Sequence, residues 1–200
     1  MKTIAFLFFI FLVQFSFAQK SDTIAYSGIF INYQDYKGNK LSYEVNCDSS
    51  SGKIKLNHFL SKNYIDVFKK GKKIQLYKDS IFGFRDCHQN DYRFFTERDK
   101  EYQILENKTI VIYVADVAVT SANGKAREFV KKYFFSTTLN SAILPLTISN
   151  LKNSFPDNVK FHNKLDQEFS SEKDISTFDN NNKMYKVNYL LSQSVLKQNK

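Results

Sequence analysis

The sequence predicts an α+β fold in which an antiparallel β-meander, or a small open barrel, packs against C-terminal helices. Short apolar runs alternate with turn residues from about residue 24 to 138. Phe and Tyr are frequent throughout this part of the chain and Trp is absent, which favours an aromatic-rich β core. From residue 139 onward the apolar residues recur at helical spacing instead.

The strongest turn signal is Asn123-Gly124, because this pair suits a two-residue hairpin turn. It joins the expected strands 109–120 and 128–136. Short connections of this kind link antiparallel neighbours, since parallel strands need longer crossover connections. The segment 110–114 is apolar on both faces, so we expect it to lie centrally and to be covered on both sides.

Three short helices are expected in the region 139–200. Thr147 can cap the first helix, and Asp157, which follows Pro156, can cap the second. Their apolar stripes are Ile148, Leu151 and Phe155; Phe161, Leu165 and Phe169; and Met184, Val187, Leu191 and Val195. These stripes need a surface to pack on, and the sheet formed by the β-rich region 19–138 provides one, so we expect one α+β unit.

The first eighteen residues have the layout of a secretory signal peptide. Lys2 precedes an almost unbroken apolar run from Ile4 to Phe17. In Ser16-Phe17-Ala18, small residues occupy the two positions that a signal peptidase recognises, ahead of cleavage after Ala18. A membrane anchor is the alternative, but a helix that spans a bilayer needs about 20 apolar residues. We therefore expect cleavage of residues 1–18 and an exported protein, periplasmic or secreted, that is not an integral membrane protein.

The chain contains two cysteines, Cys47 and Cys87. In an oxidising exported compartment we expect them to be paired rather than free. In the chain-entropy model, a bond that closes a loop of this length stabilises a fold by about 4 kcal/mol. The sequence does not show whether their α-carbons lie close enough.

The formal net charge of +9 favours anionic partners such as acidic glycans or lipid head groups. The dense lysine cluster consists of Lys69, Lys70, Lys72 and Lys73 around Gly71, where a hairpin turn is expected. One interpretation is an anion-binding site. The other is that lysine at a turn keeps a sheet edge soluble. Nucleic acid is not expected as a partner, because no nucleic-acid motif accompanies the charge.

Motifs for catalysis or for cofactor binding are missing from the sequence. It has no phosphate-binding glycine pattern, no nucleophile elbow and no paired zinc histidines. No catalytic, cofactor-binding or metal-binding residue is therefore assigned, and no cofactor is expected. An alternative is a hydrolase whose site is assembled from distant residues, such as His162, Asp166 and a loop carboxylate.

Six segments resemble an uncharacterised family of secreted or periplasmic bacterial proteins: residues 78–87, 92–95, 100–105, 143–147, 155–158 and 183–188. The resemblance implies export in a bacterium with two membranes, and it implies no activity. The leading hypothesis is a non-catalytic envelope protein that binds a surface partner or a small apolar ligand in an aromatic-lined pocket. The alternatives are the dispersed hydrolase site and a polyanion-binding surface module built on the lysine cluster.

Overall fold

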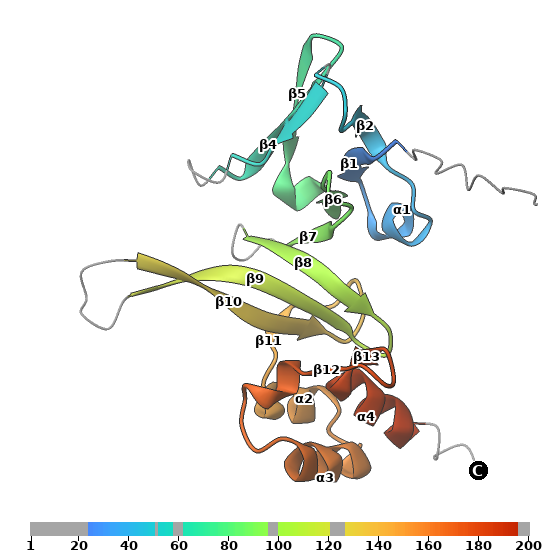
Figure 1. Cartoon of the computed structure of the whole chain (residues 1–200), viewed down its shortest axis with the longest axis vertical. Helices are drawn as coiled ribbons and strands as arrows, with labels where there is room; N and C mark the ends of the chain where they lie inside the picture. The colour runs from blue at the N-terminus through green and yellow to red at the C-terminus, as the bar shows by residue number, and fades with distance from the viewer. Residues whose placement is uncertain (1–23, 51, 58–61, 96–99, 121–126, 196–200) are drawn as a thin grey trace, which may run out of the picture.

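The computed structural model describes residues 24–50, 52–57, 62–95, 100–120 and 127–195. The expected signal peptide 1–18 and the expected turn Asn123-Gly124 lie outside these ranges. The described chain forms antiparallel sheets followed by short helices, which confirms the predicted α+β class (Figure 1).

The main sheet has eight strands in the order β11-β10-β9-β8-β7-β6-β1-β2, and every neighbouring pair is antiparallel. From β6 to β11 the neighbours are consecutive in sequence, so this part is the predicted meander. The sheet is open, with β2 and β11 at its two edges. The strands are β1 (Tyr26–Phe30), β2 (Ser42–Asn46), β6 (Gly83–Arg85), β7 (Asp91–Phe95), β8 (Lys100–Asn107), β9 (Val111–Thr120), β10 (Arg127–Ser136) and β11 (Leu144–Pro145).

A second, three-stranded sheet consists of β3 (Gly52–Lys55), β4 (Tyr64–Lys69) and β5 (Lys72–Tyr77). It lies at the end of the molecule opposite the C-terminal helices (Figure 1). The turn between β4 and β5 is Lys70-Gly71, and both residues have positive φ, 51° and 74°. Two such residues between paired strands form a tight two-residue turn, so the hairpin predicted around Gly71 is confirmed.

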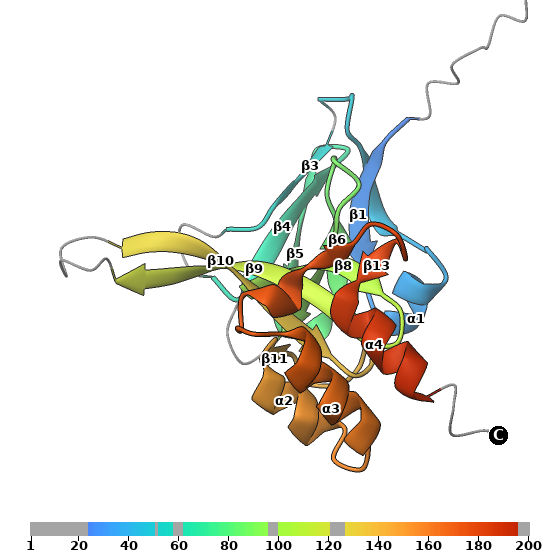
Figure 2. The ribbon, with the colours of Figure 1, turned by 60° about the horizontal axis from the view of Figure 1, so that its bottom comes forward.

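The C-terminal helices are α2 (Ile148–Ser154), α3 (Val159–Glu168) and α4 (Lys186–Val195), and Figure 2 shows them beside one another. The 3₁₀ turn η3 (Asp174–Ser176) and the two-stranded sheet of β12 (Phe178–Asp179) and β13 (Met184–Tyr185) connect α3 to α4.

Thr147 caps α2 as predicted, since its side chain accepts a hydrogen bond from the Asn150 amide. The predicted cap of α3 is wrong. Asn158, not Asp157, accepts a hydrogen bond from the Phe161 amide. Both residue types can cap a helix, and the full burial of Phe161 fixes where the first turn begins. Met184 also lies outside α4, in β13.

Three hydrophobic clusters hold the layers together. The first lies between the C-terminal helices and one face of β9 and β10, where Ile112 and Phe135 are fully buried. The second lies between the three-stranded sheet and β1, β6 and β7. The third covers the other face of β8 to β10, and Tyr113 is buried in it. Adjacent residues of β9 thus enter different clusters, which confirms that the segment 110–114 is covered on both faces.

The short helix α1 (Tyr33–Lys37) interrupts the region predicted as β structure and packs on the third cluster. Asn32 caps it by accepting a hydrogen bond from the Asp35 amide. Tyr36 stacks on Phe82 with ring centroids 5.2 Å apart. Helix α1 therefore covers part of the face of the main sheet that lies opposite the second cluster.

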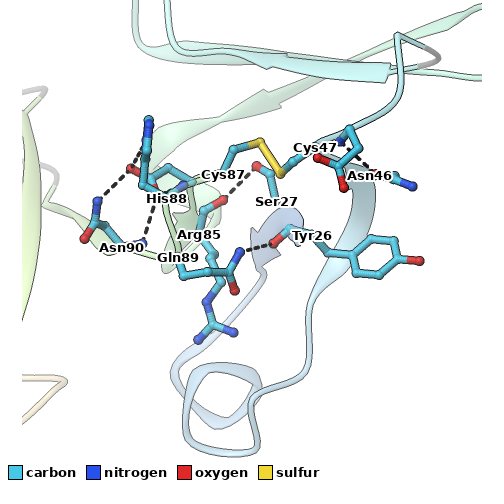
Figure 3. Close-up of a disulfide and its surroundings, with 11 residues drawn as sticks. Tyr26, Ser27, Asn46, Cys47, Arg85, Cys87, His88, Gln89 and Asn90 are labelled. Atoms are coloured by element: carbon cyan, nitrogen blue, oxygen red, sulfur yellow. Dashed lines mark hydrogen bonds and ion pairs between the residues drawn. A yellow bond between two sulfur atoms is a disulfide. The ribbon is translucent and has the colours of Figure 1, made fainter. Parts of the chain in front are cut away.

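The two cysteines form the predicted disulfide (Figure 3). Their α-carbons lie 5.5 Å apart, within the range for a disulfide. The bond joins the residue after β2 to the loop between β6 and β7. In that loop Asp86 accepts hydrogen bonds from the amides of His88 and Asn90, which define the turn.

Candidate anion-binding surface

One face of the three-stranded sheet carries lysines together with aromatic side chains. We call this surface the lysine face and define it by Lys53, Lys55, Lys62 and Lys73. The opposite face carries Ile54, Val67 and Ile74, which pack into the second cluster. Side chains alternate between the two faces of a strand, so burial of the apolar set places the lysine set on the outer face.

The strand register brings the lysines together. Lys53 of β3 and Lys73 of β5 both lie directly opposite Phe68 of β4. Lys55 lies two residues beyond Lys53 on the same strand, and alternate residues of a strand are about 7 Å apart. Lys53, Lys55 and Lys73 are all exposed, so their ammonium groups are available to a ligand.

Aromatic rings hold three of these lysines in place. The Nζ atoms of Lys53 and Lys55 lie 5.6 Å and 5.2 Å from the centroid of the Phe68 ring. The Nζ atom of Lys62 lies 5.1 Å from the centroid of the Tyr64 ring. A cation near an aromatic face is stabilised by about 0.5–1 kcal/mol at an exposed site. These contacts restrain the lysines without neutralising them.

Asp66 is the single carboxylate of the three-stranded sheet, and it already accepts hydrogen bonds from neighbouring side chains and pairs with Lys73. Burial alone would raise the pKa of Asp66, but hydrogen bonds from Asn57 and Lys73, with the charge of Lys73, hold it below the ordinary value. The Lys73 Nζ lies 3.2 Å from Oδ1, and the Asn57 amide donates to Oδ2 over 3.1 Å. Asp66 lies opposite Lys55 in the register but forms its ion pair with Lys73, which it partly neutralises. Within the described ranges, Lys53 and Lys55 form no ion pair with a carboxylate.

The predicted cluster of Lys69, Lys70, Lys72 and Lys73 is distributed over the turn and both faces of the β4–β5 hairpin. Lys73 belongs to the lysine face, whereas Lys69 and Lys72 pair with each other at the end of the hairpin, on the side of Val67. Lys70 lies in the turn itself and is exposed. The four lysines therefore surround one end of the sheet, and the anion-binding prediction for them remains a prediction.

Sequence reasoning overlooked Lys53, Lys55 and Lys62, because the two chain segments that carry them are separated from the dense cluster. The available signal was the charge count over the whole sheet rather than over one turn. Residues 52–77 include seven lysines and only one acidic residue, Asp66. Such an imbalance over a segment that folds into one small sheet creates a local positive potential.

The proposed hydrolase residues engage different partners. His162 forms a hydrogen bond with the Phe155 carbonyl over 2.9 Å through its Nε2. The Asp166 carboxylate accepts two hydrogen bonds from Lys152, at 2.7 Å and 2.8 Å, and is exposed. The two side chains therefore have separate roles on the surface of α3. His162 contacts the end of α2, and Asp166 forms an ion pair with Lys152.

Within the described ranges, no group of three or more His, Cys, Asp or Glu side chains is arranged to hold a metal ion. In the same ranges, none of the helices has both the length and the hydropathy that crossing a membrane requires. Comparison of the chain with protein-family models, with curated proteins and with solved structures found no match.

Proposed function

We propose that the chain is an exported, non-catalytic binding protein of the bacterial envelope and that its lysine face binds an acidic polysaccharide. The observation that carries this proposal is the charge imbalance of the three-stranded sheet, seven lysines against one carboxylate over residues 52–77. The strand register places Lys53 and Lys73 opposite Phe68, and the Lys55 Nζ lies over the same ring.

The electrostatics of the lysine face favour a multivalent anion. Like charges held about 7–10 Å apart repel one another, and this separation is close to the Debye length at physiological ionic strength. A ligand with regularly spaced negative charges relieves the repulsion at several lysines at once. A single small anion would relieve it at one lysine only, so the surface selects for a polymer.

A polysaccharide fits the lysine face better than a nucleic acid does. Proteins that bind single-stranded nucleic acid stack the bases on free aromatic faces. Here Lys53 and Lys55 lie over the Phe68 ring. Tyr64 and Tyr77 pack edge to face, with ring centroids 6.4 Å apart. Tyr77 is exposed but packs edge to face on Tyr64, so the surface offers mainly point charges, which suit the carboxylates or sulfates of a glycan.

Export is supported by the leader-like residues 1–18 and by the disulfide between Cys47 and Cys87. Disulfides persist in oxidising compartments such as the periplasm and the cell exterior. The resemblance to secreted bacterial proteins points in the same direction. Acidic polysaccharides are exposed in these compartments, so a protein that operates there would meet this class of ligand.

The test is a binding assay with heparin and alginate as probes and neutral dextran as the control polymer. We expect both acidic polymers to bind, with affinity that falls steeply between about 0.05 and 0.5 M salt because screening weakens each contact. The double variant Lys53→Gln, Lys55→Gln should bind about tenfold more weakly, since two lysine contacts are lost.

The matched control is the double variant Lys131→Gln, Lys132→Gln, which removes the same charge from exposed positions on β10. It should bind with nearly wild-type affinity. An equal loss in both variants would show that only net charge matters and would refute a defined site. Tighter binding of oligo(dT) than of either glycan would assign the surface to nucleic acid instead.

A further inference from the structure

A second positively charged group lies inside the protein. Arg93 of β7 retains only 7% of its exposed surface, and it faces the third cluster. Its one hydrogen bond within the described ranges runs from Nη1 to the Tyr113 hydroxyl over 3.1 Å. In those ranges no carboxylate forms an ion pair with it, in contrast to Arg85 on the neighbouring strand, which binds Asp91 through two nitrogens.

The hydroxyl that Arg93 contacts cannot serve as its counter-charge. Ser136 donates its hydroxyl proton to the Thr138 carbonyl over 2.7 Å. The Tyr113 hydroxyl lies 2.8 Å from Ser136 Oγ, so Tyr113 donates to Ser136 and accepts from Arg93. The chain of hydroxyls is complete and carries no negative charge. In the described ranges Nε and Nη2 of Arg93 have no protein acceptor, and neither is among the fully buried atoms without a partner, so the edge that they form reaches solvent.

Two aromatic rings flank the guanidinium. The Arg93 Cζ lies 5.7 Å from the ring centroids of both Phe82 and Phe95. Tyr36 of α1 continues the stack on Phe82. Phe82, Phe95 and Tyr36 are all half-buried, so they form a rim that is apolar and partly open to solvent. Contacts of this kind stabilise a partly desolvated cation by about 2 kcal/mol.

This stabilisation is smaller than the penalty for burying an unpaired charge, which amounts to several kcal/mol. Arginine is seldom buried in a protein unless it is paired with an acidic group. The free edge formed by Nε and Nη2 matches the geometry of a carboxylate, which accepts two parallel hydrogen bonds from a guanidinium. Within the described part of the chain no carboxylate occupies this edge, so it is accessible to the carboxylate of a ligand.

We propose that Arg93 is the anchor of a second binding site, which takes the carboxylate of a small ligand whose apolar body lies against Phe82 and Phe95. The ligand is a monocarboxylate, because one guanidinium edge is available and the surrounding cluster is apolar. This site uses none of the lysine-face residues, so carboxylate binding at Arg93 can be tested independently of polysaccharide binding.

The test uses acetate, phenylacetate and decanoate as probes, each paired with its uncharged amide and measured at constant ionic strength. We expect at least one of the larger carboxylates, at about 10 mM, to raise the melting temperature, while its amide does not. Calorimetric titration then gives the dissociation constant. Arg93→Met should weaken carboxylate binding at least about tenfold, because the paired hydrogen bonds and the charge are both lost.

The matched control is Arg127→Met, which makes the same substitution at an exposed position of β10 and should leave binding unchanged. If Arg93→Met does not fold, Arg93→Lys keeps the charge without the planar edge and should bind the carboxylate at least about tenfold more weakly than the wild type. The proposal is overturned if no carboxylate stabilises the protein more than its amide does, or if the Arg93 variants bind as tightly as the wild type.

Discussion

Asn188 connects helix α4 to the main sheet through hydrogen bonds. It is fully buried, its Oδ1 accepts from the Ile110 amide over 2.8 Å, and its Nδ2 donates to the Ile110 carbonyl over 3.1 Å. The same nitrogen donates to Glu106 over 2.5 Å. A side-chain amide thus pairs with both backbone groups of Ile110, the residue before β9, whose carbonyl also accepts a bond from the Lys108 amide.

Replacement of Asn188 by Ala should lower the free energy of unfolding by about 3 kcal/mol, because it leaves the Ile110 backbone groups and the Glu106 carboxylate with fewer partners in a buried environment. Urea denaturation followed by circular dichroism measures the change. Asn153→Ala, at an exposed position of α2, is the control and should change stability by less than about 0.5 kcal/mol. Equal effects of the two substitutions would contradict the anchoring role.

Asp66 makes the stability of the protein depend on pH. Burial would raise the pKa of its carboxyl group, but the hydrogen bonds from Asn57 and Lys73 hold it below the ordinary value of 3.8. The unfolded chain therefore binds a proton at a higher pH than the folded protein does. The stabilisation is fully present above the ordinary pKa and is lost as the pH falls through the lower pKa of the folded state.

The unfolding free energy should therefore decrease on acidification below about pH 4, and part of this decrease should be missing in Asp66→Asn. Urea denaturation of both proteins across the acidic range measures the difference. Asp116→Asn is the control, since Asp116 is exposed and its ion pair with Lys131 is open to solvent. Identical pH profiles for the wild type and Asp66→Asn would show that the carboxylate is not selectively stabilised.

Among the elements, the strands and helices with strong periodicity were predictable and their ends were not. Thr147 was identified as a cap, because it directly precedes the apolar stripe of α2. For α3, Asp157 and Asn158 were equally suitable by residue type, and the burial of Phe161 decided between them. Helix α1 was missed, because a single helical turn is too short to produce a periodic signal.

The disulfide joins two elements that lie next to β1 in the sheet. Cys47 follows β2 and Cys87 follows β6, and these strands pair with opposite sides of β1. The bond thus fixes the edge of the main sheet across three strands. The pairing could be predicted from the sequence, because the chain has two cysteines and is expected to enter an oxidising compartment. Only the strand order shows why the two residues meet.

Replacement of both cysteines by Ala should destabilise the protein by about 4 kcal/mol, the chain-entropy value for a loop of about 40 residues. Chemical denaturation without reductant measures this loss. Under reducing conditions the wild type should approach the stability of the double variant, which controls for the substitution itself. Two reactive thiols in the unfolded, unreduced wild type would contradict the bond.

At the scale of the whole molecule, the fold class followed from sequence and the candidate sites did not. Lys53 and Lys55 alternate with Ile54 and Leu56 in the sequence, but their position beside Lys73 depends on the register of three strands. Arg93 shares one face of β7 with Asp91 and Phe95, a pattern more typical of a solvated face, so the sequence does not indicate its burial beside Tyr113. A site built from residues on several strands can be predicted only when the pairing register of those strands is known, because the residue pattern of each strand alone does not show which residues meet.

The molecule thus carries two positively charged features with different surroundings. The lysine face is open and lies on the small sheet, at the end of the molecule away from the C-terminal helices (Figure 1). Arg93 is enclosed by aromatic side chains on the main sheet. The open surface suits a polymer, and the enclosed group suits a single carboxylate.

We propose the lysine face as the polysaccharide-binding surface. Amide chemical shifts recorded while an isotope-labelled sample is titrated with a heparin oligosaccharide test it most directly. We expect the shifts to change along β3, β4 and β5, most strongly around Phe68, and to stay constant on α2 to α4. Changes spread evenly over the lysines of the whole surface, or concentrated on β10 around Lys131 and Lys132, would contradict it.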